Sequence, residues 1–231
     1  MNFEEKYLPN QIFNRNLFSG KKNEYEKKLY FKIDDVLNLN NSFLKNKFNE
    51  SFRHTSKEMA SNPLFLNFIK FLIDTYKPKS ALEIGTFIGV FSTIIAKTSI
   101  QKVYTIEKFP EFFKIAQKNF ILNKVNNKIH QYLGDAQIVL KKIKKKFDLV
   151  FIDGDKGNYL NIFKIISKNN IKKNSMIIFD DIFFHGDILN KKFKTSKGKG
   201  IFDLLNFIKK DKKFTKTILP IYGGVLIIKK N

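Results

Sequence analysis

Short apolar runs alternate with longer amphipathic stretches over most of the chain. The apolar runs are Ala81–Ile84, Val103–Ile106, Ile129–Leu133, Phe147–Ile152 and Met176–Phe179. The stretches between them have helical character and cover Phe91–Thr98, Pro110–Asn123, Ala136–Lys145 and Tyr159–Ser167. Nearly continuous apolar strands that alternate with helices are typical of a buried parallel sheet with helices on both faces. The pattern therefore predicts an α/β fold.

The carboxyl-terminal part departs from this alternation. A predicted helix near Ile201–Lys210 is followed by two strands, Thr215–Leu219 and Val225–Lys229, with no helix between them. The turn between these strands contains a proline and two adjacent glycines, which favours an antiparallel hairpin. The pattern thus predicts seven strands, five in α/β alternation and then a pair.

Upstream of the first strand, Pro63 suits the first turn of a helix over Leu64–Tyr76. Residues 1–58 are polar and mixed, and we expect them to form a helical extension. A chain of 231 residues with 43% hydrophobic positions fits one large domain better than two small ones. We therefore expect a single domain over residues 1–231, with its core in residues 59–231.

The absence of cysteine excludes disulfides, thiolate metal sites and cysteine nucleophiles. No apolar stretch reaches the roughly 18–20 residues that span a membrane. The first ten residues are polar and lack the apolar region of a secretory signal. We therefore expect a cytoplasmic protein that does not enter the membrane.

The formal net charge is +22, which raises the question of a nucleic-acid partner. The only arginines are Arg15 and Arg53, so lysine supplies nearly all of the positive charge. Arginine is the better bidentate reader of phosphate, and a compositional bias toward lysine also produces such a charge. A basic surface still attracts RNA non-specifically, and salt-dependent binding measures that attraction.

Candidate ligand-binding residues follow the predicted strands, where open α/β sheets bind their ligands. The first strand leads into a turn, Gly85-x-x-x-Gly89, which is either an ordinary turn or a close approach of backbone to a ligand. Its spacing matches neither a dinucleotide-binding turn nor a Walker loop. Glu107 ends the second strand, where a carboxylate can accept hydrogen bonds from ribose hydroxyls. Asp135, after the third strand, either caps the next helix or accepts a hydrogen bond from an adenine amino group.

Aspartates follow the fourth and fifth strands. Asp153 ends the fourth strand, and the pair Asp180-Asp181 ends the fifth. If these strands are neighbours, the three carboxylates converge and repel one another unless a cation neutralises them. Oxygen ligands favour Mg²⁺, Mn²⁺ or Ca²⁺ over copper or zinc. The alternative is a set of solvated carboxylates at strand ends.

These stretches together resemble the metal-dependent class I O-methyltransferases of the catechol and caffeoyl-CoA type, including their bacterial branch. The resemblance runs from about Met59 to Lys230 and rests on motifs in a defined order. The motifs are Leu82-Glu83-Ile84-Gly85-Thr86-Phe87-x-Gly89, Thr105-Ile106-Glu107, Gly134-Asp135-Ala136, Phe147–Tyr159 with Asp153-Gly154-Asp155-Lys156, Ile177–Asp181 followed by His185-Gly186, and Leu219-Pro220-Ile221. The chain departs from the family at Asp181, where relatives usually carry Asn, and at Phe91, where they carry Ser.

The resemblance implies a Rossmann-like sheet of order 3-2-1-4-5-7-6 with the last strand antiparallel, and S-adenosylmethionine as cofactor. It assigns Glu107 to the ribose and Asp135 with Ala136 to the adenine. The residues that it implies for cofactor binding are Met59, Glu83, Gly85, Thr86, Gly89, Ser92, Glu107, Asp135, Ala136, Asp153 and Asp155. Asp153, Asp180 and Asp181 fall at the positions of the metal ligands, with Mg²⁺ as the expected ion and Mn²⁺ or Ca²⁺ as alternatives.

The resemblance also assigns catalysis to Lys156, as general base, and to Asp153. A free lysine has a pKa of about 10.4, so burial or the charge of the metal must lower it for this role. The implied activity is O-methylation of a catechol-like or other hydroxylated small molecule by a homodimer. Two alternatives stay open: methylation of 5-hydroxyuridine in tRNA, and a non-catalytic module that keeps the fold.

Overall fold

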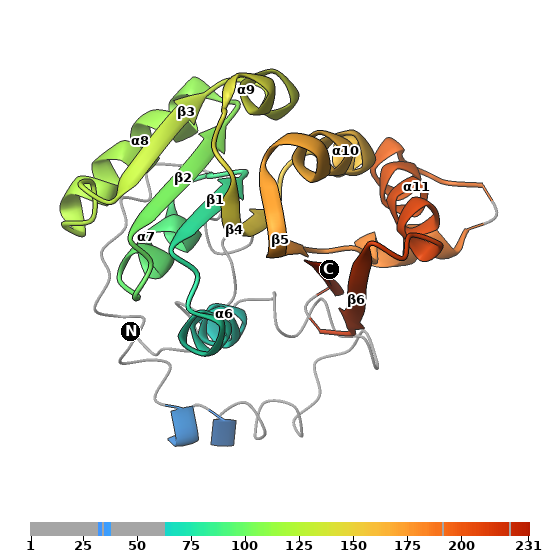
Figure 1. Ribbon diagram of the computed structural model, residues 1–231, viewed down its shortest axis with the longest axis horizontal. Coiled ribbons are helices and arrows are strands. Elements are labelled where there is room, and N and C mark those ends of the chain that lie inside the picture. The colour runs from blue at the N-terminus through green and yellow to red at the C-terminus, as the bar shows by residue number, and fades with distance from the viewer. Residues whose placement is uncertain (1–31, 34, 38–62, 191, 222) are drawn as a thin grey trace.

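The computed structural model describes residues 32–33, 35–37, 63–190, 192–221 and 223–231, which contain a seven-stranded sheet (Figure 1). Its strands lie in the order β3-β2-β1-β4-β5-β7-β6. Their bounds are β1 Ser80–Ile84, β2 Lys102–Glu107, β3 Ile129–Leu133, β4 Phe147–Ile152, β5 Ile171–Phe179, β6 Phe214–Leu219 and β7 Val225–Lys230. Strands β1 to β5 pair in parallel, and β7 runs antiparallel between β5 and β6. The predicted order and the antiparallel last strand are confirmed.

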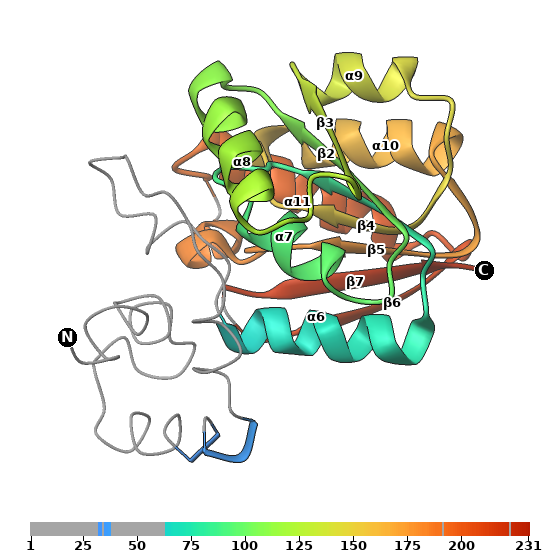
Figure 2. The same ribbon diagram turned by 90° about the vertical axis from the view of Figure 1, so that its left-hand side faces the viewer.

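Helices cover both faces of this sheet (Figure 2). Helices α6, α7 and α8 pack on one face, and α9, α10 and α11 pack on the other. Their bounds are α6 Pro63–Tyr76, α7 Val90–Ala96, α8 Pro110–Leu122, α9 Ala136–Lys142, α10 Tyr159–Asn169 and α11 Ser196–Lys209, with the short 3-10 helices η1 Lys156–Asn158 and η2 Phe184–Leu189. The predicted three-layer α/β architecture is therefore confirmed.

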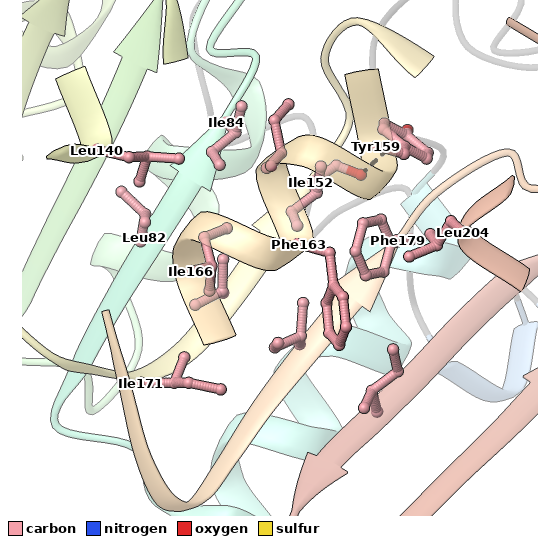
Figure 3. Close-up of a cluster of buried hydrophobic side chains, with 14 of the residues drawn as sticks. Leu82, Ile84, Leu140, Ile152, Tyr159, Phe163, Ile166, Ile171, Phe179 and Leu204 are labelled. Carbon is pink, nitrogen blue, oxygen red and sulfur yellow. Dashed lines mark hydrogen bonds between the residues drawn. The ribbon is translucent and has the colours of Figure 1, made fainter. Parts of the chain in front are cut away.

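The two cores follow the alternation of side chains along each strand. Val150 and Ile152 of β4 lie in the core under α9, α10 and α11, whereas Leu149 and Phe151 face α6, α7 and α8. Figure 3 shows the first of these cores, in which side chains of α10 meet those of β1, β4 and β5. In the second core, the rings of Phe91 and Phe151 stack with their centroids 3.9 Å apart. Because both faces of the central strands are buried, their sequences are apolar without a break.

Some element boundaries differ from the predicted ones. Helix α11 begins before the predicted Ile201 because Thr195 caps it, accepting a hydrogen bond from the Gly198 amide at 3.0 Å. Strand β5 begins at Ile171 rather than at Met176, and its exposed residues 172–174 coincide with a register shift against β4. Helix α9 ends at Lys142, before the exposed lysines 144–145 that were expected to continue it.

The predicted extension over residues 1–58 lies outside the described residues, apart from helical pieces at 32–33 and 35–37, and so does Met59. Among the described helices, none combines the length and the apolar character that crossing a membrane requires.

The register of the sheet brings the ends of several strands to one level. Ile84 at the end of β1 pairs with Ile106 on β2 and with Ile152 on β4, and Ile152 pairs with Phe179 on β5. The residues that come next on these four strands are Gly85, Glu107, Asp153 and Asp180. Residues far apart in the sequence therefore form one row along the carboxyl edge of the sheet, where ligands of open α/β sheets bind.

Candidate functional site

The turn after β1 passes directly over the end of β4. Gly85 has a φ of +95°, and a Cβ atom there would collide with the carbonyl oxygen of Asp153. Its amide donates to the Ile106 carbonyl at 3.0 Å, so the turn is anchored to β2 as well. Gly89 has a φ of +84° and begins α7 against the ring of Phe120. Both predicted glycines thus occupy positions where a side chain would clash with a neighbouring element and where the positive φ favours glycine.

Glu83 lies buried beneath this turn. One of its carboxylate oxygens, Oε2, accepts hydrogen bonds from Ser92 Oγ and, at 2.6 Å, from Thr105 Oγ1. The hydroxyls of Thr105 and Thr86 are 2.5 Å apart and extend the network toward the turn. Burial raises the pKa of Glu83 to about 8; the two hydroxyl hydrogen bonds lower the pKa, and the carboxylates of Glu107 and Asp153 raise it further. Ser92 therefore contacts Glu83 in this structure, and its predicted contact with the cofactor stays a prediction.

Glu107 is held rigidly at the end of β2. Its Oε2 accepts from the Phe87 amide at 2.7 Å and its Oε1 accepts from the Phe109 amide at 2.9 Å. Burial raises the pKa of Glu107, although these amide hydrogen bonds oppose the shift. A carboxylate oxygen accepts more than one hydrogen bond, so Glu107 retains capacity for a diol such as that of ribose.

Asp135 and Asp155 both act as amino-terminal caps. Asp135 caps α9 by accepting from the Gln137 amide at 2.9 Å, and Lys108 lies 3.5 Å from its other oxygen. This structural role confirms the simpler of its two predicted readings. Asp155 caps η1, accepting from the Gly157 amide at 3.1 Å. Ala136, the first residue of α9, packs against the core.

Two of the three predicted metal ligands, Asp153 and Asp181, lie close to the side chain of Lys156. The Lys156 Nζ atom lies 3.0 Å from Asp153 Oδ1 and 3.7 Å from Asp181 Oδ2. Asp180 Oδ1 accepts a hydrogen bond from the Asp181 amide at 2.9 Å, and the Asp180 carboxylate contributes to the raised pKa of Lys156. Lys156, Asp180 and Asp181 are all buried. The structure therefore brings Asp153 and Asp181 together at Lys156, and the convergence of all three aspartates on one cation stays a prediction.

The protonation of Lys156 differs from the expected one. Burial lowers the pKa of this ammonium group, but the carboxylates of Asp153, Asp181 and Asp180 raise it, and the net result lies well above the ordinary value. The lowered pKa that a general base requires is thus absent from this arrangement, because three anions surround one cation.

The same cluster is the candidate site for the divalent cation. The residues described by the structure include no group of three or more His, Cys, Asp or Glu side chains arranged to hold a metal ion. The donor chemistry nevertheless fits a hard cation, since three aspartates and one ammonium leave a formal charge of −2 in a buried cluster. Metal binding at Asp153, Asp180 and Asp181 stays a prediction, and it requires these side chains to rearrange around the ion.

Backbone geometry at the end of β5 favours a short polar residue. Asp181 has a φ of +53°, a conformation that Asp and Asn adopt more readily than other residues with a Cβ. Its Oδ1 lies against Gly223, where a Cβ atom would collide with it. The departure from Asn to Asp at this position therefore preserves the backbone and changes the charge.

Two residues of the quoted motifs, Thr105 and Tyr159, have roles in the site that the sequence did not predict. The Tyr159 hydroxyl donates toward the carbonyls of Ile152, at 3.3 Å, and Asp180, at 3.0 Å, and so links the ends of β4 and β5. Thr105 bridges Glu83 and Thr86. Tyr159 follows the aspartate motif directly, and this adjacency was the available signal. Thr105 sits inside an apolar strand, where its partners depend on the register.

Comparison with known proteins agrees with this geometry. The family model described as O-methyltransferase matches residues 34–231. A probable caffeoyl-CoA O-methyltransferase of Dictyostelium discoideum is 28% identical over 172 residues, which cover 71% of this chain and 74% of the relative. A catechol O-methyltransferase of Niastella koreensis is 27% identical over 131 residues, or 54% of this chain and 58% of the relative.

Among solved structures, an O-methyltransferase of Bacillus cereus in complex with S-adenosylhomocysteine superimposes with a TM-score of 0.72 at 20% identity, covering 99% of each chain. That likeness supports the fold, and the family match covers most of the sequence. The chain belongs to the O-methyltransferase family, the S-adenosylmethionine-dependent class that its motifs resemble.

Proposed function

We propose that this enzyme methylates a hydroxyl oxygen of a small, catechol-like acceptor with the help of a divalent cation. The observation that carries the proposal is the buried cluster of Lys156 with Asp153 and Asp181 beside the Gly85 turn. In this proposal an acceptor hydroxyl at the charged cluster would be held close to the methyl group of a cofactor bound at the Gly85 turn. The caffeoyl-CoA and catechol O-methyltransferases among its relatives, from Dictyostelium and Niastella, support the acceptor class.

The proposed cofactor site extends from the Gly85 turn along the carboxyl edge toward β3. Bound S-adenosylmethionine supplies a methyl group that its sulfonium charge already activates. Glu83 and Thr86 would line its methionine end, and Glu107, fixed by two amides, would orient the ribose. Asp135 and Ala136 would flank the adenine at the start of α9. The S-adenosylhomocysteine in the Bacillus cereus relative supports a cofactor of this class.

In the proposed site, Asp153, Asp180 and Asp181 would hold the cation. A divalent ion there would polarise an acceptor hydroxyl and oppose the protonated form of Lys156. Lys156 would then take the hydroxyl proton at Nζ. Asp153 would orient Lys156, since its Oδ1 lies 3.0 Å from that nitrogen.

The charge of the catalytic edge favours a small acceptor over a polyanion. In the described segments that follow β1 to β5, up to residue 190, acidic side chains outnumber lysines. The acidic ones are Glu107, Glu111, Asp135, Asp153, Asp155, Asp180, Asp181 and Asp187, and the lysines are Lys108 and Lys156. Lysines return from residue 191 onward, in the rest of the connection that follows β5. An RNA acceptor would meet repulsion along these segments, whereas cationic S-adenosylmethionine would be attracted to them.

The deciding experiment is a methyl-transfer assay with purified protein in Mg²⁺ or in EDTA. It offers 3,4-dihydroxybenzoate and tRNA in parallel. We expect transfer to the catechol in Mg²⁺ and loss of most of that transfer in EDTA. Equal activity in both buffers would refute the metal assignment, and transfer to tRNA alone would refute the acceptor class.

Substitution of Lys156 tests its proposed role. Lys156→Met keeps the length of the side chain and removes the ammonium, so turnover should fall by roughly 10²–10⁴-fold, the range of a lost general base. Affinity for S-adenosylmethionine, measured by calorimetry, should change little, because the assigned cofactor contacts lie elsewhere. The exposed Lys168→Met serves as the matched control. Normal turnover of Lys156→Met would remove this lysine from the mechanism.

A further inference from the structure

The first turn of α11, residues 196–200, packs against the loop that carries Lys156. A Cβ atom at Gly200 would lie 2.5 Å from the carbonyl oxygens of both Lys156 and Gly157. Side-chain carbon atoms essentially never approach oxygen so closely. Helix α11 therefore touches η1 backbone to backbone at Gly200, and any side chain there would push the two elements apart.

The same turn contacts a second loop of the site on another side. A Cβ atom at Gly198 would collide with the carboxylate of Asp187, in η2. That carboxylate accepts from the amides of Lys194, at 2.8 Å, and Thr195, at 3.0 Å, and from the Thr195 hydroxyl at 2.7 Å. The Lys194 amide, the Thr195 hydroxyl and the side chain of Asn190 lower the pKa of Asp187 to about 2.

These contacts fix where the Lys156 ammonium lies. The η1 loop is only three residues long, and within the loop Asp155 bonds to the Gly157 amide and to the Asn158 side chain. Such local bonds set the shape of the loop, but they do not set its distance from β5. Contact with α11 at Gly200 provides that outer limit, and Nζ then lies between a carboxylate of β4 and one of β5.

We propose that Gly200 is a positioning residue, whose missing side chain lets α11 hold the η1 loop and so keeps the Lys156 ammonium between Asp153 and Asp181. Gly198 and Asp187 hold the other side of the same helical turn. The inference rests on the proposed role of Lys156 for its effect on turnover. Its effect on the position of Lys156 does not depend on the acceptor.

The test is Gly200→Ala, with Lys199→Ala as the control on the same turn. Lys199 is exposed and pairs with Asp203, so its loss leaves the η1 contact intact. Competitive acetylation of lysines, read by mass spectrometry, reports the environment of Lys156 without any acceptor. We expect Lys156 to be protected in the parent and labelled at least fivefold faster in Gly200→Ala, with other lysines unchanged.

Turnover of 3,4-dihydroxybenzoate supplies the second readout. In Gly200→Ala, kcat should fall roughly 10–100-fold, since a displacement near 1 Å has effects of this size, while the Kd for S-adenosylmethionine changes less than about twofold. A purely structural role would lower thermal stability and leave kcat and Lys156 labelling as in the parent, which would overturn the inference. If the parent itself transfers no methyl group, the proposed function fails, and the labelling still decides the inference.

A second variant guards against failure of Gly200→Ala to fold. Asp187→Asn adds no heavy atom and removes part of the acceptor capacity that ties residues 194–195, just before α11, to η2. We expect a smaller increase in Lys156 labelling, about two- to fivefold. Parental labelling of Lys156 in both variants, or in Asp187→Asn when Gly200→Ala does not fold, contradicts the proposal.

Discussion

At the scale of single residues, burial changes the charge of a carboxylate that the sequence presents as ordinary. Glu83 is 1% exposed, and the other carboxylates of the carboxyl edge add repulsion to the loss of hydration. With a pKa of about 8, Glu83 is mostly protonated at neutral pH in the cofactor-free protein. A cationic amino group beside it would favour the ionised form. If the cofactor binds beside Glu83 as proposed, its binding would release a proton from this residue.

This shift has a defined effect on stability. The unfolded chain ionises Glu83 near its ordinary pKa of 4.5, whereas the folded protein retains the proton up to about pH 8. Between these values the folded state binds more protons, so the contribution of Glu83 to stability is lost as the pH rises from about 4.5 to about 8. Glu83→Gln is neutral at every pH, and its stability relative to the parent should increase across this window.

The measurement is urea unfolding of the cofactor-free protein at pH 5 and pH 8.5. The free energy of unfolding of Glu83→Gln, relative to that of the parent, should be higher at pH 8.5 than at pH 5. Glu111→Gln, in the exposed first turn of α8, should show the same difference from the parent at both pH values. A constant difference for Glu83→Gln would mean that Glu83 is ionised in the folded protein.

Residues at strand ends were predictable, and their mutual bonds were not. An apolar run followed by Asp153 or by Asp180-Asp181 places carboxylates at the carboxyl edge of any parallel sheet. The partnership of Ser92 with Glu83 depends on how α7 lies against β1, which periodicity does not specify. The raised pKa of Lys156 likewise depends on distances to three carboxylates, and those distances are a property of the packed site.

At the scale of elements, Tyr159 joins the ends of β4 and β5 from the start of α10. Its hydroxyl is fully buried and donates toward the carbonyls of Ile152 and Asp180. Tyr159→Phe should destabilise the fold by about 1–3 kcal/mol, because it leaves a buried acceptor without its donor. Thermal or urea unfolding measures the loss. The control is Tyr132→Phe on β3, where the side chain is only partly buried and the loss of stability should be smaller. Equal losses of stability in the two variants would contradict the role of Tyr159.

Element positions followed from periodicity wherever packing and pattern agreed. Helix α11 was placed too late because its first turn contains Gly198 and Gly200, and glycine reads as a breaker in an isolated sequence. Its close contact with η1 and the cap at Thr195 compensate for that weak propensity. Strand β5 was begun too late for a related reason, since residues 172–174 are exposed and polar although they continue the strand.

At the scale of the whole molecule, the positive charge is distributed unevenly. The connections at the amino edge of the sheet, opposite the site, are rich in exposed lysines. Those between β3 and β6 are Lys141, Lys142, Lys144, Lys145, Lys146, Lys168, Lys172, Lys173, Lys209, Lys210, Lys212 and Lys213. Helices end at this edge, where their dipoles favour cations, so part of the asymmetry follows from the fold itself. The result is a basic edge opposite the acidic segments that follow β1 to β5 up to residue 190.

This distribution predicts where RNA binds when it binds non-specifically. Reversal of four exposed amino-edge lysines (Lys142, Lys144, Lys212 and Lys213 to Glu) should weaken binding of poly-U, because each phosphate contact contributes roughly 0.7 to the slope of log K against log salt. A slope lower by about 2–3 is expected. The control reverses Lys70, Lys114, Lys118 and Lys194, which changes the net charge equally at scattered positions. If both sets reduce the slope alike, net charge alone governs binding. If only the amino-edge set reduces it, RNA is attracted to the edge of the sheet opposite the methyl-transfer site. That result would accord with a small molecule as the acceptor.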